Sequence, residues 1–223
     1  KTGSISVLTK YLIPDHCKLV ALGKPTEKES KKWFKRYEKY LPNTGEIVFF
    51  DRSWYTRALV EATMGYCTKR QYTYFMKNVI PWEKKQIEEG VEFFKFYLSI
   101  EKNTQQKRID KRATSPLVYW KISENDLKML DKWDAFTLYK EQMFKRTSYD
   151  EAPWIVLNAN NKKVAILSAL RFILNAFDYP DKDLPKPKTW SEGLNNYKVK
   201  INKVLFENLS YQQYKTLRVF ADE

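Results

Sequence analysis

An apolar run passes directly into charge in the segment Ile47-Val48-Phe49-Phe50-Asp51-Arg52-Ser53-Trp54-Tyr55. Its first four residues are all large and apolar, with no polar residue alternating between them. This pattern is typical of a strand that is buried on both faces, as in a parallel sheet covered by helices. The sequence therefore predicts a parallel strand whose carboxyl end presents Asp51 and Arg52.

Three further runs of similar composition lie at residues 18–22, 93–100 and 154–157. Helix-like segments lie at residues 5–12, 27–40, 54–64, 69–90 and 162–176. A chain that alternates short buried strands with amphipathic helices favours an α/β fold, a doubly wound parallel sheet flanked by helices. We expect a single domain over residues 1–223.

Two regions depart from this alternation. Residues 104–146 contain no strand-like run, only two charged helical stretches broken at Ser115-Pro116, with Ser123 suited to cap the second. We interpret residues 104–146 as a helical insertion. After Tyr179 the chain becomes rich in proline, lysine and aspartate, which predicts a C-terminal arm over residues 178–223 with a last helix near residues 211–219.

The composition restricts the class of partner. Among 223 residues, 40 Lys and Arg oppose 27 Asp and Glu, a formal charge of +13. Such an excess indicates an anionic partner: nucleic acid, a membrane surface or a phosphate substrate. No apolar run approaches the roughly 20 residues of a membrane-spanning helix, so we expect a soluble protein. Two cysteines without a CxxC pattern favour reduced thiols and a cytoplasmic setting.

Asp51 and Arg52 are the first candidate site residues. Ligands of open α/β sheets bind at the carboxyl ends of strands, and a carboxylate there can hold the Mg²⁺ that bridges phosphates. An arginine beside it can pair with a phosphate through two hydrogen bonds. The alternative is that Asp51 caps the helix at residues 54–64 and that Arg52 is a surface charge. Lys1-Thr2, followed by a helical run, resembles the end of a phosphate-binding loop and favours the first interpretation.

Basic residues gather in the predicted insertion. Between residues 102 and 121 a single acid, Asp110, accompanies the basic residues Lys102, Lys107, Arg108, Lys111, Arg112 and Lys121. Cations that close over a transferring phosphoryl group stabilise its developing charge, which suits a lid. The alternative is an ordinary solvated helix face. Lys24 differs from most surface lysines because it follows a predicted strand, where substrate is expected.

Taken together, these segments resemble the type 2 polyphosphate kinases, P-loop phosphotransferases that move phosphoryl groups between inorganic polyphosphate and nucleotides. The resemblance covers residues 1 to about 177. It rests on segments that occur in order along the chain: Lys1 to Ile5, Lys24 to Glu27, Gly45 to Ala58, Val60-Glu61, Met64-Gly65, Gln106 to Arg112, Pro116-Leu117, Trp120-Lys121, Asp126, Trp133-Asp134, Tyr139, Ala152 to Trp154 and Asn158 to Asn160.

The resemblance implies a P-loop kinase-like fold in which residues 104–146 form the lid. It assigns Lys1 to the phosphate-binding Walker A lysine and Asp51 to the Walker B carboxylate at Mg²⁺. Arg52 then contacts phosphate, and Arg112 is the lid arginine over the transferring group. Substrate-binding or phosphate-binding roles fall to Thr2, Lys24, Arg57 and Lys121. The first strand and most of the P-loop, including a second acidic residue, would precede Lys1.

The function implied is a reversible, Mg²⁺-dependent transfer between polyphosphate and a nucleotide, with ADP or GDP as the preferred acceptor and a nucleoside monophosphate as a possible one. The resemblance also implies a homo-oligomer with no nucleic-acid or membrane partner. Two other functions stay open from the residues. One is an ATP-dependent nucleoside or nucleotide kinase of the same fold, and the other is a noncatalytic nucleic-acid-binding protein, which would also explain the charge.

Overall fold

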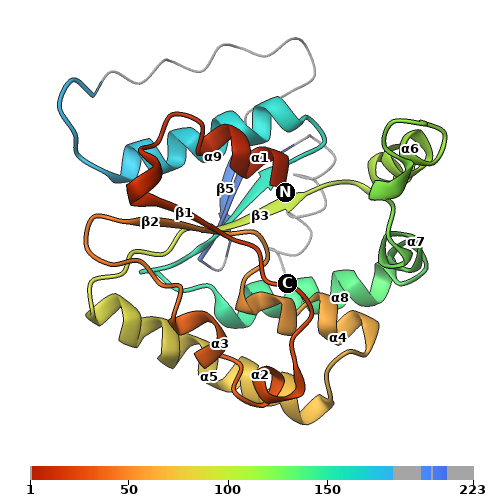
Figure 1. Ribbon diagram of the computed structural model, residues 1–223, viewed down its shortest axis with the longest axis horizontal. Helices are drawn as coiled ribbons and strands as arrows, with labels where there is room; N and C mark the ends of the chain where they lie inside the picture. The colour runs from red at the N-terminus through yellow and green to blue at the C-terminus, as the bar shows by residue number, and fades with distance from the viewer. Residues whose placement is uncertain (1, 183–196, 202, 210–223) are drawn as a thin grey trace. The chain divides into compact units, whose positions relative to one another are not determined.

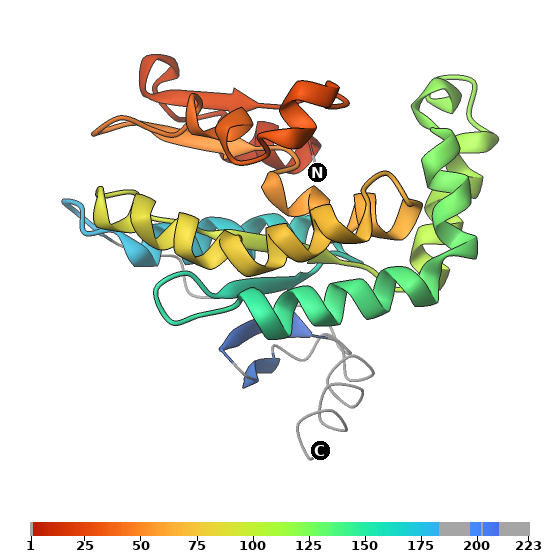
Figure 2. The same ribbon diagram turned by 90° about the horizontal axis from the view of Figure 1, so that it is seen from below.

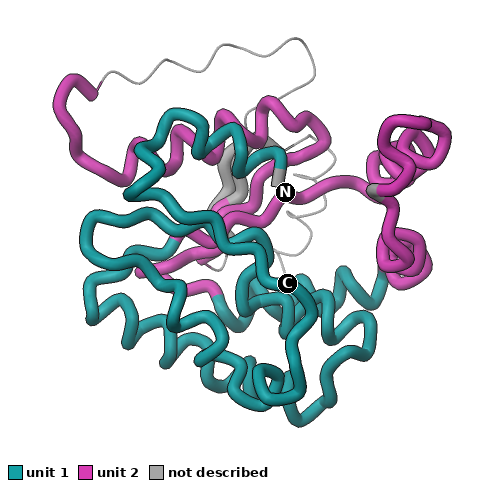
Figure 3. Tube along the Cα trace, viewed as in Figure 1, with its two compact units in different colours: residues 1–93, 134–147 teal, residues 94–133, 148–223 magenta. Residues whose placement is uncertain are grey.

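The computed structural model describes residues 2–182, 197–201 and 203–209 of the chain. The chain divides into two compact units, which Figure 3 distinguishes by colour. Unit 1 is built from residues 1–93 and 134–147, and unit 2 from residues 94–133 and 148–223.

Unit 1 contains a parallel pair of strands, β1 (Cys17–Val20) and β2 (Ile47–Phe50), which run side by side in Figure 1. The register pairs Cys17 with Ile47 and Val20 with Phe50, so both strands end at the same edge. The other elements of the unit are α1 (Thr2–Leu8), η1 (Pro14–His16), α2 (Glu27–Lys31), α3 (Lys35–Glu38), η2 (Trp54–Arg57), α4 (Val60–Met64), α5 (Lys69–Glu88) and nearly all of α8 (Trp133–Thr147).

Aromatic side chains form the core of unit 1. Trp54 is 4% exposed, and its indole ring lies edge-on to the rings of Tyr37, Phe50 and Trp82. The indole N–H donates to Oε1 of the fully buried Glu83 at 2.9 Å, which satisfies a polar group inside the core. Trp54 therefore joins the segment after β2 to α3 and α5.

A buried ion pair accompanies this core. Nε of Arg57 lies 3.0 Å from Oε2 of Glu61, one helical turn further on, and the side chains are 1% and 10% exposed. The guanidinium of Arg57 also lies over the ring of Trp33, 3.9 Å from its centroid, and Nη2 donates to Oγ of Ser30 at 3.0 Å. Burial raises the pKa of Glu61, and the positive charge of Arg57 opposes this effect.

Unit 2 contains a four-stranded sheet in the order β3 (Lys95–Ser99), β4 (Trp154–Asn158), β6 (Val204–Leu209) and β5 (Tyr197–Ile201). β3, β4 and β6 are parallel, whereas β5 is antiparallel to β6. All five residues of β4 are buried, as expected for a central strand covered on both faces. The helical elements are α6 (Lys102–Ala113), η3 (Tyr119–Lys121), α7 (Glu124–Asp131) and α9 (Lys162–Ala176). Figure 2 shows α6 and α7 as neighbouring helices.

The predicted α/β class is confirmed, since parallel sheets are combined with helices in both units. The described strands form two hydrogen-bonded sheets, one in each unit. Two predicted helices are interrupted. Residues 27–40 divide into α2 and α3 where Lys32 leaves the helical region (φ −114°, ψ 58°), and residues 54–64 divide into η2 and α4 at Leu59 (φ −120°, ψ −81°).

The insertion expected at residues 104–146 appears as α6, η3, α7 and α8, with the boundary between the two units after Trp133. Ser123 caps α7 as predicted, accepting from the backbone N–H of Asp126 at 3.2 Å. Within the stretch expected to be an arm, residues 178–223, the structure contains the strands β5 and β6, and β6 pairs with β4. The helix expected near residues 211–219 lies outside the described residues. Within the described ranges, none of the helices is long and apolar enough to cross a membrane.

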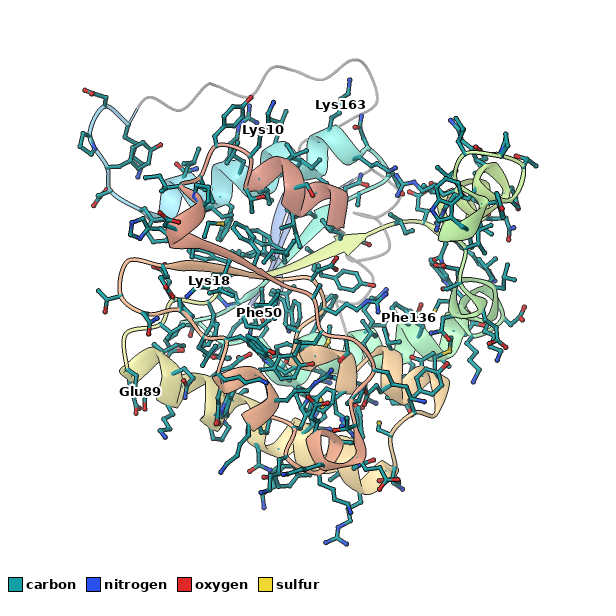
Figure 4. The ribbon with its side chains drawn as sticks, in the orientation of Figure 1. Lys10, Lys18, Phe50, Glu89, Phe136 and Lys163 are labelled. Carbon is teal, nitrogen blue, oxygen red and sulfur yellow. The ribbon has the colours of Figure 1, made fainter. Side chains whose placement is uncertain are left out.

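The buried pair of unit 1 generates a prediction about stability. Replacing Glu61 by Ala leaves the Arg57 guanidinium buried without its anionic partner, so we expect a loss of about 3 kcal/mol in the free energy of unfolding. Urea denaturation measures it. The matched control is Glu89→Ala, because Glu89 is exposed at the end of α5 (Figure 4) and its contact with Lys85 is 3.7 Å long. That variant should lose less than about 0.5 kcal/mol; equal losses in the two variants would contradict the prediction.

A second prediction concerns the strand pair. Nζ of Lys18 donates to Oε1 of Glu46 at 2.6 Å, and this contact, with the backbone N–H of Asn43, lowers the pKa of Glu46. Lys18→Met should therefore raise that pKa toward its ordinary value, measured by carboxyl NMR titration. A carboxyl group whose pKa is lowered by folding stabilises the folded state at pH values above its pKa in the unfolded chain. This stabilisation is lost as the pH falls through the pKa of the folded state. The variant should thus be less stable than the parent at pH 7 and equal to it in strong acid, while Lys28→Met changes neither quantity.

Candidate functional site

The carboxyl ends of β1 and β2 place three of the predicted residues in neighbouring loops. Val20 and Phe50 are register partners, and the backbone N–H of Asp51 donates to the carbonyl of Val20 at 2.9 Å. Lys24 and Asp51 therefore both follow strands that end at one edge of the β1–β2 pair. Asp51 is 9% exposed, whereas Arg52 and Lys24 are exposed. A buried carboxylate beside accessible cations suits the recognition of an anion together with a metal ion.

Arg52 has a backbone conformation that is rare for a residue with a side chain. Its φ is 73°, in the left-handed region, where a Cβ atom costs about 1 kcal/mol or more. Ser53 follows in extended conformation and caps η2, accepting from the N–H of Tyr55 at 3.4 Å, and its carbonyl accepts from the hydroxyl of Tyr37 at 3.2 Å. The turn between β2 and η2 is thus held by hydrogen bonds to the side chain and to the carbonyl of Ser53. Arg52, which precedes Ser53, is the strained residue of this turn.

The loop that bears Lys24 is held at both of its ends. Nη2 of the buried Arg36 donates to the carbonyl of Gly23 at 2.5 Å. Thr26 begins α2 with a capping box, in which its hydroxyl accepts from the N–H of Glu29 and the Glu29 carboxylate accepts from the N–H of Thr26. That backbone hydrogen bond is the main cause of the lowered pKa of Glu29. Lys24 is consequently an exposed cation on a fixed loop.

Arg57 does not present a free guanidinium. The contacts with Trp33, Ser30 and Glu61 described above enclose it, and it is 1% exposed. The sequence placed Arg57 in the phosphate-binding set because it lies in the motif that carries the resemblance. The charge of Arg57 is used in the core of unit 1, so Arg57 is not part of the proposed phosphate-binding set. In the sequence, this pair is indicated only by Glu61, an acidic residue four positions after Arg57.

Arg112 lies on α6 in unit 2 and is half-buried. Its Nε donates to the carbonyl of Arg108 at 3.1 Å, and its Nη1 lies 3.9 Å from Oδ2 of Asp126. The same oxygen of Asp126 accepts from the backbone N–H and the hydroxyl of Ser123, which closes the capping box of α7. Asp126 thus connects the predicted lid arginine to the start of the next helix. The capping pattern is visible in the sequence, but the contact with Arg112 is not.

The remaining predicted residues are Lys1, Thr2 and Lys121. Lys1 lies outside the described residues. Thr2 is the first residue of α1, and Lys121 is the last residue of η3. The structure therefore groups Lys24, Asp51 and Arg52 in unit 1, groups Arg112 with Asp126 in unit 2, and leaves the other assignments as predictions.

A metal ion is compatible with the residues that are present. Within the part of the chain that the structure describes, no cluster of three or more His, Cys, Asp or Glu side chains could form a cage for a metal ion. Mg²⁺ does not require such a cage, because it keeps several waters and binds through one or two carboxylates together with substrate phosphates. Asp51, a buried carboxylate at a strand end, fits that mode of binding.

Comparisons with known proteins identify the family of the chain. The model of the family described as polyphosphate kinase 2 matches residues 1–185. The chain is 42% identical over 199 residues to a Corynebacterium glutamicum protein named polyphosphate kinase PPK2B, covering 86% of this chain. It is 43% identical over 184 residues to a Mycolicibacterium smegmatis protein named GDP-polyphosphate phosphotransferase, covering 82%. The chain spans 65% of the length of each of these two relatives.

A solved structure gives the same result for the fold. The crystal structure of polyphosphate kinase 2 from Arthrobacter aurescens superimposes with a TM-score of 0.75 at 29% identity, covering 83% of this chain and 68% of that one. The strand-end aspartate, the neighbouring arginine and the helical segment with Arg112 thus occur in a chain whose sequence and fold both match one family over most of its length. The chain belongs to the polyphosphate kinase 2 family.

Proposed function

We propose that this chain catalyses the reversible, Mg²⁺-dependent transfer of a phosphoryl group between inorganic polyphosphate and a nucleotide. The observation that carries the proposal is the buried carboxylate of Asp51 beside the exposed guanidinium of Arg52, at the strand end shared with the Lys24 loop, in a member of this family. Relatives are named GDP-polyphosphate and ADP-polyphosphate phosphotransferases. These names support ADP or GDP as the acceptor that forms ATP or GTP.

The proposed roles follow from the charge that develops in phosphoryl transfer. Little covalent chemistry is needed from the protein, so positioning and electrostatic stabilisation dominate. Arg52 and Lys24 bind phosphate oxygens of the two substrates, and Arg112 offsets negative charge on the transferring group. Lys1, Thr2 and Lys121 complete the proposed phosphate-binding set. The transfer is reversible because the bond that breaks and the bond that forms are both phosphoanhydrides.

The proposed metal ion is held by Asp51. Bound there, the metal ion would supply positive charge that offsets part of the charge of the phosphates. The protein's own contribution is the burial of Asp51 and the hydrogen bond from its N–H to Val20, which fix the start of the turn relative to β1. A preorganised carboxylate loses little conformational freedom when the metal and the substrates bind.

The proposal extends to the setting of the protein. We propose a cytoplasmic homo-oligomer that uses residues 104–146 as a lid and binds neither nucleic acid nor membrane. Under this proposal the charge of +13 serves a polyanionic substrate. Salt-sensitive, tight binding of DNA or RNA without any phosphotransferase activity would oppose it.

The central prediction uses the polyphosphate reaction itself. A mixture of ADP, Mg²⁺ and long-chain polyphosphate should yield ATP with the purified protein, measured by luciferase. Asp51→Asn keeps the shape of the side chain but removes its charge, so kcat should fall by about 100-fold or more while the urea midpoint stays near that of the parent. Asp15→Asn, a change in the exposed η1 turn, is the control and should keep full activity. ATP-driven phosphorylation of a nucleoside, with no ATP formed from polyphosphate, would overturn the proposal.

The strained conformation of Arg52 gives a separate prediction. Arg52→Ala and Arg52→Gly both remove the guanidinium, so both should lower kcat by about tenfold or more. Only glycine removes the Cβ atom at φ 73°. The free energy of unfolding of Arg52→Gly should therefore be about 1 kcal/mol higher than that of Arg52→Ala. Urea denaturation of the two variants measures the difference. If alanine is as stable as glycine at this position, the conformation carries no strain.

A further inference from the structure

Arg108 differs from the other basic residues of α6 in where its guanidinium points. Nη2 of Arg108 donates to the carbonyl of Ala159 at 2.7 Å and to the carbonyl of Asn160 at 2.9 Å. Lys107 and Lys111, its neighbours on the helix, are exposed, and no hydrogen bond to another described residue holds their ammonium groups. Burial and the charge of Arg112 both lower the pKa of Arg108, so the two carbonyls must offset the cost of holding its charge there.

The loop that receives Arg108 is itself fixed to the sheet of unit 2. The N–H of Ala159 donates to the carbonyl of Ser99 at 2.7 Å, and the N–H of Asn160 donates to Oδ1 of Asn158 at 3.0 Å. Oδ1 of Asn160 accepts from the N–H of Glu101, the N-cap residue of α6, at 3.0 Å. The loop therefore contacts the N-cap of α6 at Glu101 and the helix itself at Arg108. Two attachment points, unlike one, determine the direction of a helix.

Arg112 depends on this arrangement through a direct contact. It lies one turn beyond Arg108, and its Nε donates to the Arg108 carbonyl at 3.1 Å. The second constraint on its side chain is the 3.9 Å contact with Asp126. A shift of α6 would therefore move the guanidinium of Arg112 away from the position set by the loop. Displacements of about 1 Å at a catalytic group can cost a factor of about 100 in rate.

We propose that Arg108 is a positioning residue, which fixes α6 to the loop after β4 and so sets the place of Arg112 in phosphoryl transfer. The sequence predicts a basic lid segment that includes Arg108, whereas the hydrogen bonds of Arg108 are made to backbone carbonyls. The proposal rests on the proposed function, because Arg112 is assigned its role there.

A double-mutant cycle tests the proposal by steady-state formation of ATP from ADP and polyphosphate. Arg108→Ala should lower kcat by about tenfold or more with KM values changed less than about threefold, since it removes orientation and not a substrate contact. Arg112→Ala sets the reference, and the double variant should be no slower than Arg112→Ala within about twofold. If the two losses multiply, Arg108 acts on its own and the proposal is wrong. The control is Lys163→Ala, an exposed lysine near the start of α9 (Figure 4).

Hydrogen exchange provides a readout that does not depend on activity. In Arg108→Ala, amides of residues 101–112 should exchange several-fold faster than in the parent, while those of β3 and β4 stay protected. Lys163→Ala should change neither group. Unchanged exchange over residues 101–112 in Arg108→Ala would overturn the anchoring role. If the parent protein makes no ATP from polyphosphate, the proposed function fails, and the exchange experiment still decides whether Arg108 fixes α6.

Discussion

The indole of Trp54 is the constraint on which the site in unit 1 depends. It lies three residues after Asp51, and its ring is enclosed by aromatic side chains from α3 and α5. The indole N–H donates to Glu83, and the backbone carbonyl of Trp54 accepts from the indole N–H of Trp33 at 2.9 Å. A buried ring whose N–H is hydrogen-bonded, on a backbone that is held as well, has few alternative positions. The short segment between β2 and Trp54 must therefore turn sharply, and Arg52 takes up the left-handed conformation that this requires.

The positive charge of the protein serves two purposes that composition does not distinguish. Some cations are structural: Arg57 is buried against Glu61 and Trp33, Lys95 lies 4.4 Å from the ring centroid of Tyr149, and Arg108 is bound to carbonyls. Others, including Lys24 and Arg52, are exposed at strand ends. The net charge indicates an anionic partner, but burial decides which cations are available to it.

Local patterns in the sequence were sufficient for β2, α9 and the cap at Ser123, because apolar composition and capping act over a few residues. Features that depend on distant residues were not predicted. The strands β5 and β6 and the breaks at Lys32 and Leu59 do not show in the local sequence pattern. For the candidate site, the strand-end position predicts Asp51 and Arg52 as candidates, whereas the enclosure of Arg57 depends on Trp33 and Ser30, which lie far from it in the chain.

In both units, side chains of a neighbouring helical segment donate hydrogen bonds to carbonyls of the loops that follow the strands. In unit 1, side chains of the α3 region donate to loop carbonyls, Arg36 to Gly23 and Tyr37 to Ser53. In unit 2, Arg108 of α6 donates to the carbonyls of the loop after β4. Carbonyls in such loops have no strand partner and need donors when they are buried. Supplying these donors from a neighbouring helix fixes the loop and the helix together, so that the residues they carry are positioned before any substrate binds. For the proposed phosphoryl transfer, in which positioning and electrostatics provide most of the catalysis, this rigidity is the contribution that the fold itself can make.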